Sequence, residues 1–249
     1  MKITPEHIRA MKGREKIAAL TTYDYPMTRL LDECGVPVLL VGDSLGMVVL
    51  GYPDTTHVTM EEMEHHIRAA ARAKPNALLG GDLPYHSYHT PEQALTNARR
   101  LVAAGAAFVK AEGGREILPS VRAIIDAGIP FMGHLGMLPQ HVLEEGGYHK
   151  KGRSESEHTT LIADAKALAD AGAFAIVLEL IIAEVACELT QAISIPTIGI
   201  GSGPDCDGQI LVTHDLWGTF PWFTPKFVKK QLPSAVQMRA IVAEWKGEL

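Results

Sequence analysis

Eight short apolar segments recur along the 249-residue chain, and most are nearly continuous in Val, Ile, Leu and Ala. Runs of this length, without regular alternation of polar residues, are typical of parallel strands that are covered on both faces. The segments therefore predict an α/β fold built on a parallel sheet. They lie at 16–23, 36–42, 77–83, 107–112, 130–135, 174–179, 196–201 and 209–213.

Helical patterns lie between most of these apolar runs, and two of them begin at clear N-capping signals. Thr59 opens a T-x-x-E capping box before a helix that extends to about residue 74. Thr90 followed by Pro91 predicts the start of a second helix, which Gly105 ends. Further helices are predicted before the first strand and at 115–127, 157–171, 183–192 and about 233–246.

Eight strands that alternate with helices favour a closed (β/α)8 barrel, a TIM barrel with an extra N-terminal helix. Because no shift in composition marks a boundary, a single domain is predicted over residues 1–249. An open, doubly wound sheet is the alternative fold. Only GSGPDCDG separates the last two strands, so either a loop replaces the crossover helix or the eighth strand is misplaced. The aromatic, Pro-rich segment 214–232 receives no assignment.

The composition argues against several classes of partner. A formal net charge of −6 disfavours nucleic acid, whose binding needs a surplus of Lys and Arg. No run approaches the roughly 18 apolar residues of a membrane span. Cys34, Cys187 and Cys206 show no paired spacing, which argues against a zinc ribbon or a disulfide framework. Free thiols, and a first segment without the apolar core of a signal peptide, predict a cytoplasmic protein. The net charge is compatible with a small anionic substrate, for which local charge matters more than the total.

Four acidic residues each lie at the C-terminal end of a predicted strand: Asp43, Asp82, Glu112 and Glu179. A carboxylate in such a buried position is unfavourable unless a positive group meets it. Because crossovers between parallel strands are right-handed, the loops that follow the strands gather at one end of a barrel, where barrel enzymes carry their active sites. The four carboxylates are therefore predicted to share a site with a hard cation. Mg²⁺ suits this oxygen-rich, sulfur-free set better than zinc does.

Three other polar residues share this register. Ser44 follows Asp43, and His134 ends the fifth strand. Lys110 lies two residues before Glu112, so their side chains are predicted on the same side of the fourth strand. Each residue alone has an ordinary explanation, such as a turn cap, a buried ion pair or a satisfied core histidine. Five of the eight strands would then need separate explanations, which favours one shared site.

Other patterns carry less information. The G-x-G-x-G pattern at 199–203 does not have the spacing of a dinucleotide-binding fingerprint and predicts a tight turn after the seventh strand. The remaining histidines, among them His86, His89 and His141, show no metal-ligand spacing and are predicted at the surface or in loops.

Longer motifs follow one another from about residue 16 to 230, namely VGDSLGMVVLGYPDT, GGDLPY, VKAEGG, GHLGMLPQ, GGYHKKG, IGIGSG, CDGQILVTHDLWG and PKFVK. Their order and content resemble the ketopantoate (3-methyl-2-oxobutanoate) hydroxymethyltransferase family of pantothenate biosynthesis. The resemblance implies a barrel of the phosphoenolpyruvate/pyruvate type with Mg²⁺ as cofactor. It also implies 5,10-methylenetetrahydrofolate as co-substrate and a ring-based homo-oligomer, often a decamer.

The resemblance further implies which residues hold the metal and the substrate. Asp43 and Asp82 correspond to metal ligands, and Glu112 to a third that acts through water. Ser44 and Lys110, together with the two aspartates, would hold the 2-oxo acid.

The implied catalytic residues are Glu179 as general base, Lys110 as a second positive group, and His134 as a hydrogen-bonding assistant. The implied reaction moves a hydroxymethyl group from 5,10-methylenetetrahydrofolate to 3-methyl-2-oxobutanoate, through a magnesium-stabilised enolate, to give 2-dehydropantoate. One alternative is a magnesium-dependent 2-oxo acid lyase or aldolase of the same superfamily. Another is a non-catalytic barrel that binds a metal or organises an assembly.

Overall fold

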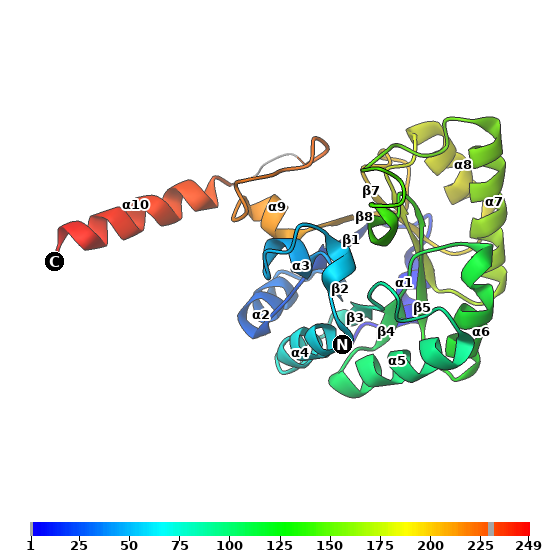
Figure 1. Ribbon diagram of the computed structural model, residues 1–249, viewed down its shortest axis with the longest axis horizontal. Helices are drawn as coiled ribbons and strands as arrows, with labels where there is room; N and C mark the ends of the chain where they lie inside the picture. The colour runs from blue at the N-terminus through cyan, green and yellow to red at the C-terminus, as the bar shows by residue number, and fades with distance from the viewer. Residues whose placement is uncertain (1, 229–231) are drawn as a thin grey trace. The chain divides into compact units, whose positions relative to one another are not determined.

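A closed, eight-stranded parallel barrel is the centre of the computed structural model, which describes residues 2–228 and 232–249 (Figure 1). The strands follow one another around the barrel in chain order, so the open-sheet alternative is excluded. Their bounds are β1 Ile17–Thr21, β2 Val38–Val41, β3 Leu78–Asp82, β4 Phe108–Lys110, β5 Phe131–Gly136, β6 Ala175–Glu179, β7 Thr197–Ile200 and β8 Gly208–Leu211.

The eight predicted strands are confirmed, each within two residues of its predicted bounds. Strands β2, β3 and β4 are buried at every position, as expected for parallel strands with both faces covered. Because β4 ends at Lys110, Glu112 lies just beyond the strand rather than within it. Residues 201–207 contain no helix, so a loop replaces the crossover helix before β8.

Helices α2, α4, α5, α6, α7 and α8 surround the barrel (Figure 1). The α-helices are α1 Pro5–Met11, α2 Tyr25–Glu33, α3 Leu45–Val48, α4 Met60–Ala71, α5 Pro91–Ala104, α6 Leu118–Asp126, α7 Glu155–Asp170, α8 Ala183–Ala192, α9 Thr213–Trp217 and α10 Ser234–Gly247. Short 3₁₀ helices occupy η1 Thr55–His57, η2 Arg115–Ile117 and η3 Pro139–His141.

The predicted helix signals are confirmed where they were specific. Thr59 accepts a hydrogen bond from Glu62 N at 3.2 Å, and Glu62 accepts one from Thr59 N at 2.8 Å, which completes the capping box. Helix α7 starts two residues earlier than predicted, because Ser154 forms a further capping box with Glu157. Helices α2, α3 and α9 were not predicted.

Helix α1 covers the N-terminal end of the barrel. Arg9 donates hydrogen bonds to the carbonyls of Gly172 and Ala173, just before β6, and Lys12 pairs with Asp207, just before β8, at 2.8 Å. Ile8 is fully buried in the apolar cluster that the strands form. The extra N-terminal helix is thus confirmed, and it leaves the C-terminal end of the strands for a site.

The chain divides into two compact units, residues 1–210 and 211–249. In the second unit, Gly218 ends α9 with a φ of 68°, and Ala235 N donates to Gly218 O at 3.2 Å. Residues 218–228, part of the segment without an assignment, contain turns but neither helix nor strand, and 229–231 lie outside the described residues. The single domain over 1–249 stays a prediction. Every helix in the described ranges is too short or too polar to cross a membrane.

Candidate active site

The polar residues predicted at the strand ends come together at the C-terminal end of the barrel. Asp82 and Lys110 are the last residues of β3 and β4, and Glu179 is the last residue of β6. Asp43 lies two residues beyond β2, and His134 lies within β5. Because the strands are parallel and neighbouring, their C-terminal ends form one face. All five residues except Glu179 are buried, and the Glu179 side chain is 14% exposed.

Lys110 is the cationic centre of this cluster. Its Nζ lies 2.9 Å from Asp82 Oδ1 and 3.2 Å from His134 Nδ1. Burial alone would lower the pKa of Lys110, but attraction to Asp82, Glu112 and Asp43 outweighs burial and raises the pKa. Lys110 therefore stays protonated and donates to both neighbours.

His134 connects Lys110 to Glu179 as a neutral ring. Burial, followed by the charge of Lys110, lowers the pKa of His134 well below its usual value. Since Nδ1 faces the Lys110 ammonium and Nε2 lies 3.1 Å from Met137 O, which can only accept, the proton belongs on Nε2. The same Nε2 lies 3.3 Å from Glu179 Oε2. The ring therefore orients Glu179 without contributing a positive charge.

Gln140 is a functional candidate that the sequence analysis missed. Its Nε2 donates to Asp43 Oδ2 at 2.7 Å and to Leu83 O at 3.0 Å, and its backbone N donates to Glu112 Oε2 at 3.0 Å. It lies in η3, four residues beyond β5, where strand-end register gives no signal. The last letter of the GHLGMLPQ motif was the one available sign.

Ser44 points its hydroxyl toward the site rather than capping a helix. It precedes α3 but makes no side-chain capping bond there, and its Oγ lies 2.8 Å from Tyr23 Oη. Gly42 permits this close packing, because a Cβ at that position would lie 3.0 Å from Ser44 Oγ and 3.5 Å from Asp82 Oδ2. Tyr23, which sequence reasoning did not single out, is a second missed neighbour of the site.

The cluster contains more carboxylates than cations, and their pKa values reflect this. Burial, followed by the charge of Asp82, raises the pKa of Asp43 to about 7. Burial and then Asp43 raise the pKa of Glu112 well above its usual value. Burial also raises the pKa of Glu179 to about 7, although Lys110 opposes the shift. A further positive charge at this place would relieve the unfavourable burial.

The donor atoms suit a magnesium ion whose remaining ligands are supplied by water and substrate. Within the described ranges, no three His, Cys, Asp or Glu side chains are grouped to hold a metal by themselves. Asp82 nevertheless contacts Lys110 Nζ through Oδ1 at 2.9 Å and accepts from Asp43 N through Oδ2 at 3.2 Å, so the two aspartates are adjacent and share one cation. Mg²⁺ is commonly held by one or two carboxylates, with water and substrate completing its octahedron. The arrangement fits that pattern.

Comparison with known proteins identifies the family. The family model described as ketopantoate hydroxymethyltransferase matches residues 2–249. The chain belongs to the ketopantoate hydroxymethyltransferase family. A 3-methyl-2-oxobutanoate hydroxymethyltransferase from Moorella thermoacetica is 51% identical over 251 residues, which cover 100% of this chain and 93% of that protein. One from Ignicoccus hospitalis is 53% identical, covering 92% of this chain and 88% of that protein. The predicted family is confirmed.

Solved structures of other proteins share the barrel fold of this chain. A 2,3-dimethylmalate lyase of the phosphoenolpyruvate mutase/isocitrate lyase superfamily has a TM-score of 0.64 at 17% identity, covering 99% of this chain and 88% of that chain. A phosphoenolpyruvate phosphomutase from Streptomyces platensis has a TM-score of 0.65 at 16% identity, covering 86% of this chain and 82% of that chain. At such identities the likeness concerns the fold alone, and it confirms the predicted (β/α)8 barrel.

Proposed function

We propose that the protein transfers a hydroxymethyl group from 5,10-methylenetetrahydrofolate to 3-methyl-2-oxobutanoate, giving 2-dehydropantoate and tetrahydrofolate in pantothenate biosynthesis. A bond forms between C3 of the acid and the methylene carbon, C3 loses its proton, and the two C–N bonds of the methylene bridge break. Water supplies the hydroxyl oxygen, and one of its protons together with the C3 proton restores N5–H and N10–H of tetrahydrofolate. The observation that carries the proposal is a lysine-centred carboxylate cluster with a base of near-neutral pKa, in a chain about 50% identical to hydroxymethyltransferases over its full length.

The cofactor proposed for this site is Mg²⁺. Asp43 and Asp82 would hold it directly and Glu112 through water, and when bound it would stabilise negative charge on the oxygens of the 2-oxo acid. The raised pKa values of Asp43 and Glu112 support this assignment, because two buried carboxyls that resist ionisation become good ligands once a cation compensates them.

Glu179 is proposed to remove the C3 proton. A carboxyl with a pKa near 7 is half ionised at neutral pH, which is close to the optimum for a general base. Lys110 places a fixed positive charge next to the developing enolate oxygen, and Ser44 is proposed to donate to the carboxylate of the acid. The neutral His134 ring positions Glu179 through the 3.3 Å contact between Nε2 and Oε2.

A magnesium-dependent lyase or aldolase is the second candidate, since the related barrels include a dimethylmalate lyase. Both candidates need an acidic C–H and a stabilised enolate, but the lyase needs no folate. The deciding experiment incubates 3-methyl-2-oxobutanoate with the protein in D₂O and follows C3 exchange by NMR, with Mg²⁺ or with chelator, and then adds 5,10-methylenetetrahydrofolate.

We expect chelator-sensitive exchange without folate, and formation of 2-dehydropantoate only with folate. Exchange without any product in the presence of folate would favour the lyase. An absence of exchange in the presence of Mg²⁺ would favour a non-catalytic barrel.

The protein is also proposed to form a homo-oligomer, as its family relationship implied, and α10 supports this. Met238, Ile241, Val242 and Trp245 are 57%, 65%, 54% and 58% exposed. Their i, i+3, i+4, i+7 spacing places them on one face of the helix. An apolar face of this kind, which the unit 211–249 does not cover by itself, marks an interaction surface. The unpaired Cys34, Cys187 and Cys206 support the proposal of a cytoplasmic location.

Charges on this face of α10 are expected to reduce the assembly. The double variant Ile241→Glu, Trp245→Glu buries two carboxylates if α10 packs against another copy, so its mass by light scattering after size exclusion should fall below that of the wild type. The control Ala243→Glu adds a charge to the opposite side of the helix and should keep the wild-type mass. An unchanged mass for the double variant removes α10 from the interface.

A further inference from the structure

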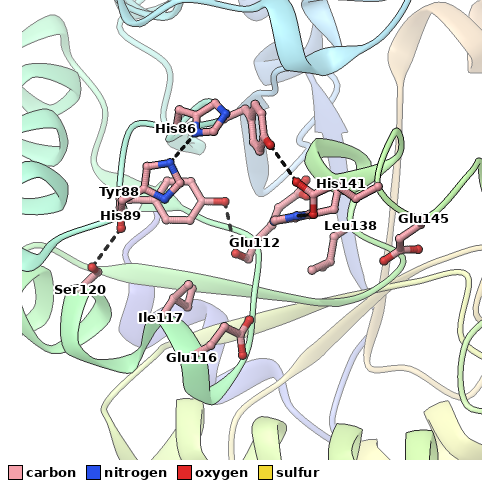
Figure 2. A pocket seen from close by; sticks show the side chains of 12 residues that line it. His86, Tyr88, His89, Glu112, Glu116, Ile117, Ser120, Leu138, His141 and Glu145 are labelled. Carbon is pink, nitrogen blue, oxygen red and sulfur yellow. Dashed lines mark hydrogen bonds and ion pairs between the residues drawn. The ribbon is translucent and has the colours of Figure 1, made fainter.

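A cavity of about 460 Å³ opens beside the carboxylate cluster, between the loops that follow β3, β4 and β5 (Figure 2). Its lining residues come from these three segments and, for Ser120, from the first turn of α6, at the end of the barrel that carries the candidate active site. Glu112 forms part of both: it lines the cavity, and its Oε2 accepts the hydrogen bond from Gln140 N. A molecule in the cavity would therefore lie next to the proposed reaction centre.

One wall of the cavity is aromatic. The rings of Tyr85 and His86 have centroids 3.7 Å apart, and those of Tyr85 and His141 are 5.8 Å apart in an edge-on arrangement. His86 has a φ of 62°, a left-handed conformation that is uncommon outside glycine, and Gln93 fixes it by donating to its carbonyl at 2.9 Å. Such backbone strain concentrates at functional sites. The wall offers a surface on which a flat ring can stack.

The cavity also contains acidic side chains, and one of them, Glu116, has an oxygen free to accept a further hydrogen bond. Glu144 accepts from Tyr85 Oη at 2.9 Å and pairs with His141 Nδ1 at 2.8 Å, while Glu145 pairs with Lys151 at 2.6 Å. Within the described residues, the hydrogen bond of Glu116 is the one that its Oε1 accepts from Gly114 N at 2.7 Å. The exposed Glu116 carboxylate thus retains a charge and an oxygen for a ligand.

We propose that this cavity binds the pterin ring of the folate co-substrate, with Glu116 as its recognition residue. The inference rests on the proposed function and assigns a place to its co-substrate. The pyrimidine edge of a pterin presents two adjacent donors, N3–H and the 2-amino group, and a carboxylate accepts such a pair in parallel. Because the cavity is acidic, the anionic glutamate tail of folate has to leave it toward solvent.

The size and position of the cavity agree with this assignment. Its volume lies in the range of pockets that bury most of a small ligand. Since Glu112 belongs to its wall, a pterin bound here brings the methylene group between N5 and N10 to the side of the barrel on which the acceptor carbon is activated. His86 and His89 lie in the loop after β3, as predicted, and His141 ends η3. The three gather around one cavity, which their sequence spacing did not show.

The test compares Glu116→Gln with the wild type by calorimetric titration of two probes, tetrahydrofolate and the tail-less 6-methyltetrahydropterin. Gln keeps one acceptor for Gly114 N but replaces a charged acceptor by a donor, so Kd for both probes should rise about ten- to a hundredfold. C3 exchange of 3-methyl-2-oxobutanoate should stay within about twofold of wild type, since Glu116 is outside the carboxylate cluster. The matched control Glu184→Gln, at an exposed position of α8, should leave both Kd values unchanged.

A second variant tests whether the pterin occupies the cavity at all, independently of its hydrogen bonds to Glu116. Ile117→Trp fills part of the cavity without touching a carboxylate and should raise both Kd values and the KM for methylenetetrahydrofolate. Unchanged Kd values in both variants would overturn the pterin assignment while leaving transfer by the wild type intact. A rise for tetrahydrofolate alone would assign the cavity to the tail and equally overturn it. A wild type that exchanges C3 but neither binds tetrahydrofolate nor makes product would instead overturn the proposed function.

Discussion

Glu179→Gln should reduce the rate of C3 proton exchange in 3-methyl-2-oxobutanoate by about a hundred- to ten-thousandfold, the usual contribution of a positioned general base. Gln has the size of Glu and keeps an oxygen that faces His134 Nε2, at 3.3 Å from the carboxylate in the wild type. It cannot accept a proton from carbon. Since Asp43, Asp82 and Lys110 are unchanged, the affinity for the 2-oxo acid, measured by calorimetry, should stay within a few fold. Exchange at the wild-type rate in this variant would give the role of base to another group.

At saturating Mg²⁺, where a bound cation would keep the proposed ligand Asp43 ionised, the pH dependence of the wild-type exchange provides a second check on Glu179. The active form of a general base is deprotonated, so exchange should be slow below the pKa of Glu179, rise tenfold per pH unit, and level off above a pKa of about 7. Titration of His134 should add no second step to the pH–rate profile in this range, because burial and Lys110 lower the pKa of His134 well below its usual value. A rate that is flat from pH 5 to pH 8 would contradict a buried carboxyl as the base.

The barrel could be predicted from the sequence because its strands are buried on both faces. Most of these strands are nearly continuous in apolar residues, and their bounds agree with the predicted ones to within two residues. The positions of Asp43, Asp82 and Glu179 then followed from topology, since residues that end parallel strands meet at one face. Helix α2 was missed although Asp24 caps it and Pro26 lies in its first turn, because its nine residues begin close after β1. Helix α3 has four residues and no capping bond, so it left no local signal.

The parts of the site that lie in loops could not be derived in this way. Gln140 reaches Asp43 and Glu112 only because η3 folds back over the barrel, and that path depends on packing rather than on periodicity. The cavity beside Glu112 combines residues from three loops whose spacing in the chain is unrelated to their separation in space. Strand register therefore predicts the groups that act on the 2-oxo acid, whereas the pocket proposed for the pterin emerges from the folded loops.

Asp82→Asn should remove the response of the protein to Mg²⁺. In the wild type, millimolar Mg²⁺ should raise Tm by about 5 °C or more, because a ligand at a hundred times its Kd stabilises by about 2.7 kcal/mol. The substitution preserves the shape of the side chain and an acceptor for Asp43 N, but it removes the charge that faces Lys110 at 2.9 Å. C3 exchange should then fall at least about a hundredfold, since both the cation site and the position of Lys110 are altered.

Asp164→Asn is the matched control for this experiment. Asp164 is also a buried aspartate in an ion pair, 2.6 Å from Arg115 Nε, but it lies on α7, outside the carboxylate cluster. Loss of the Asp164 charge should lower Tm by the same amount with and without Mg²⁺. The rise in Tm that Mg²⁺ causes should therefore be unchanged. Asp82→Asn should instead abolish the rise in Tm that Mg²⁺ causes. The variant should stay folded, because Asp43 and Glu112 continue to compensate the charge of Lys110. If Mg²⁺ raised the Tm of Asp82→Asn as much as that of the wild type, Asp82 would be a partner of Lys110 alone, and the cation would have to be held elsewhere.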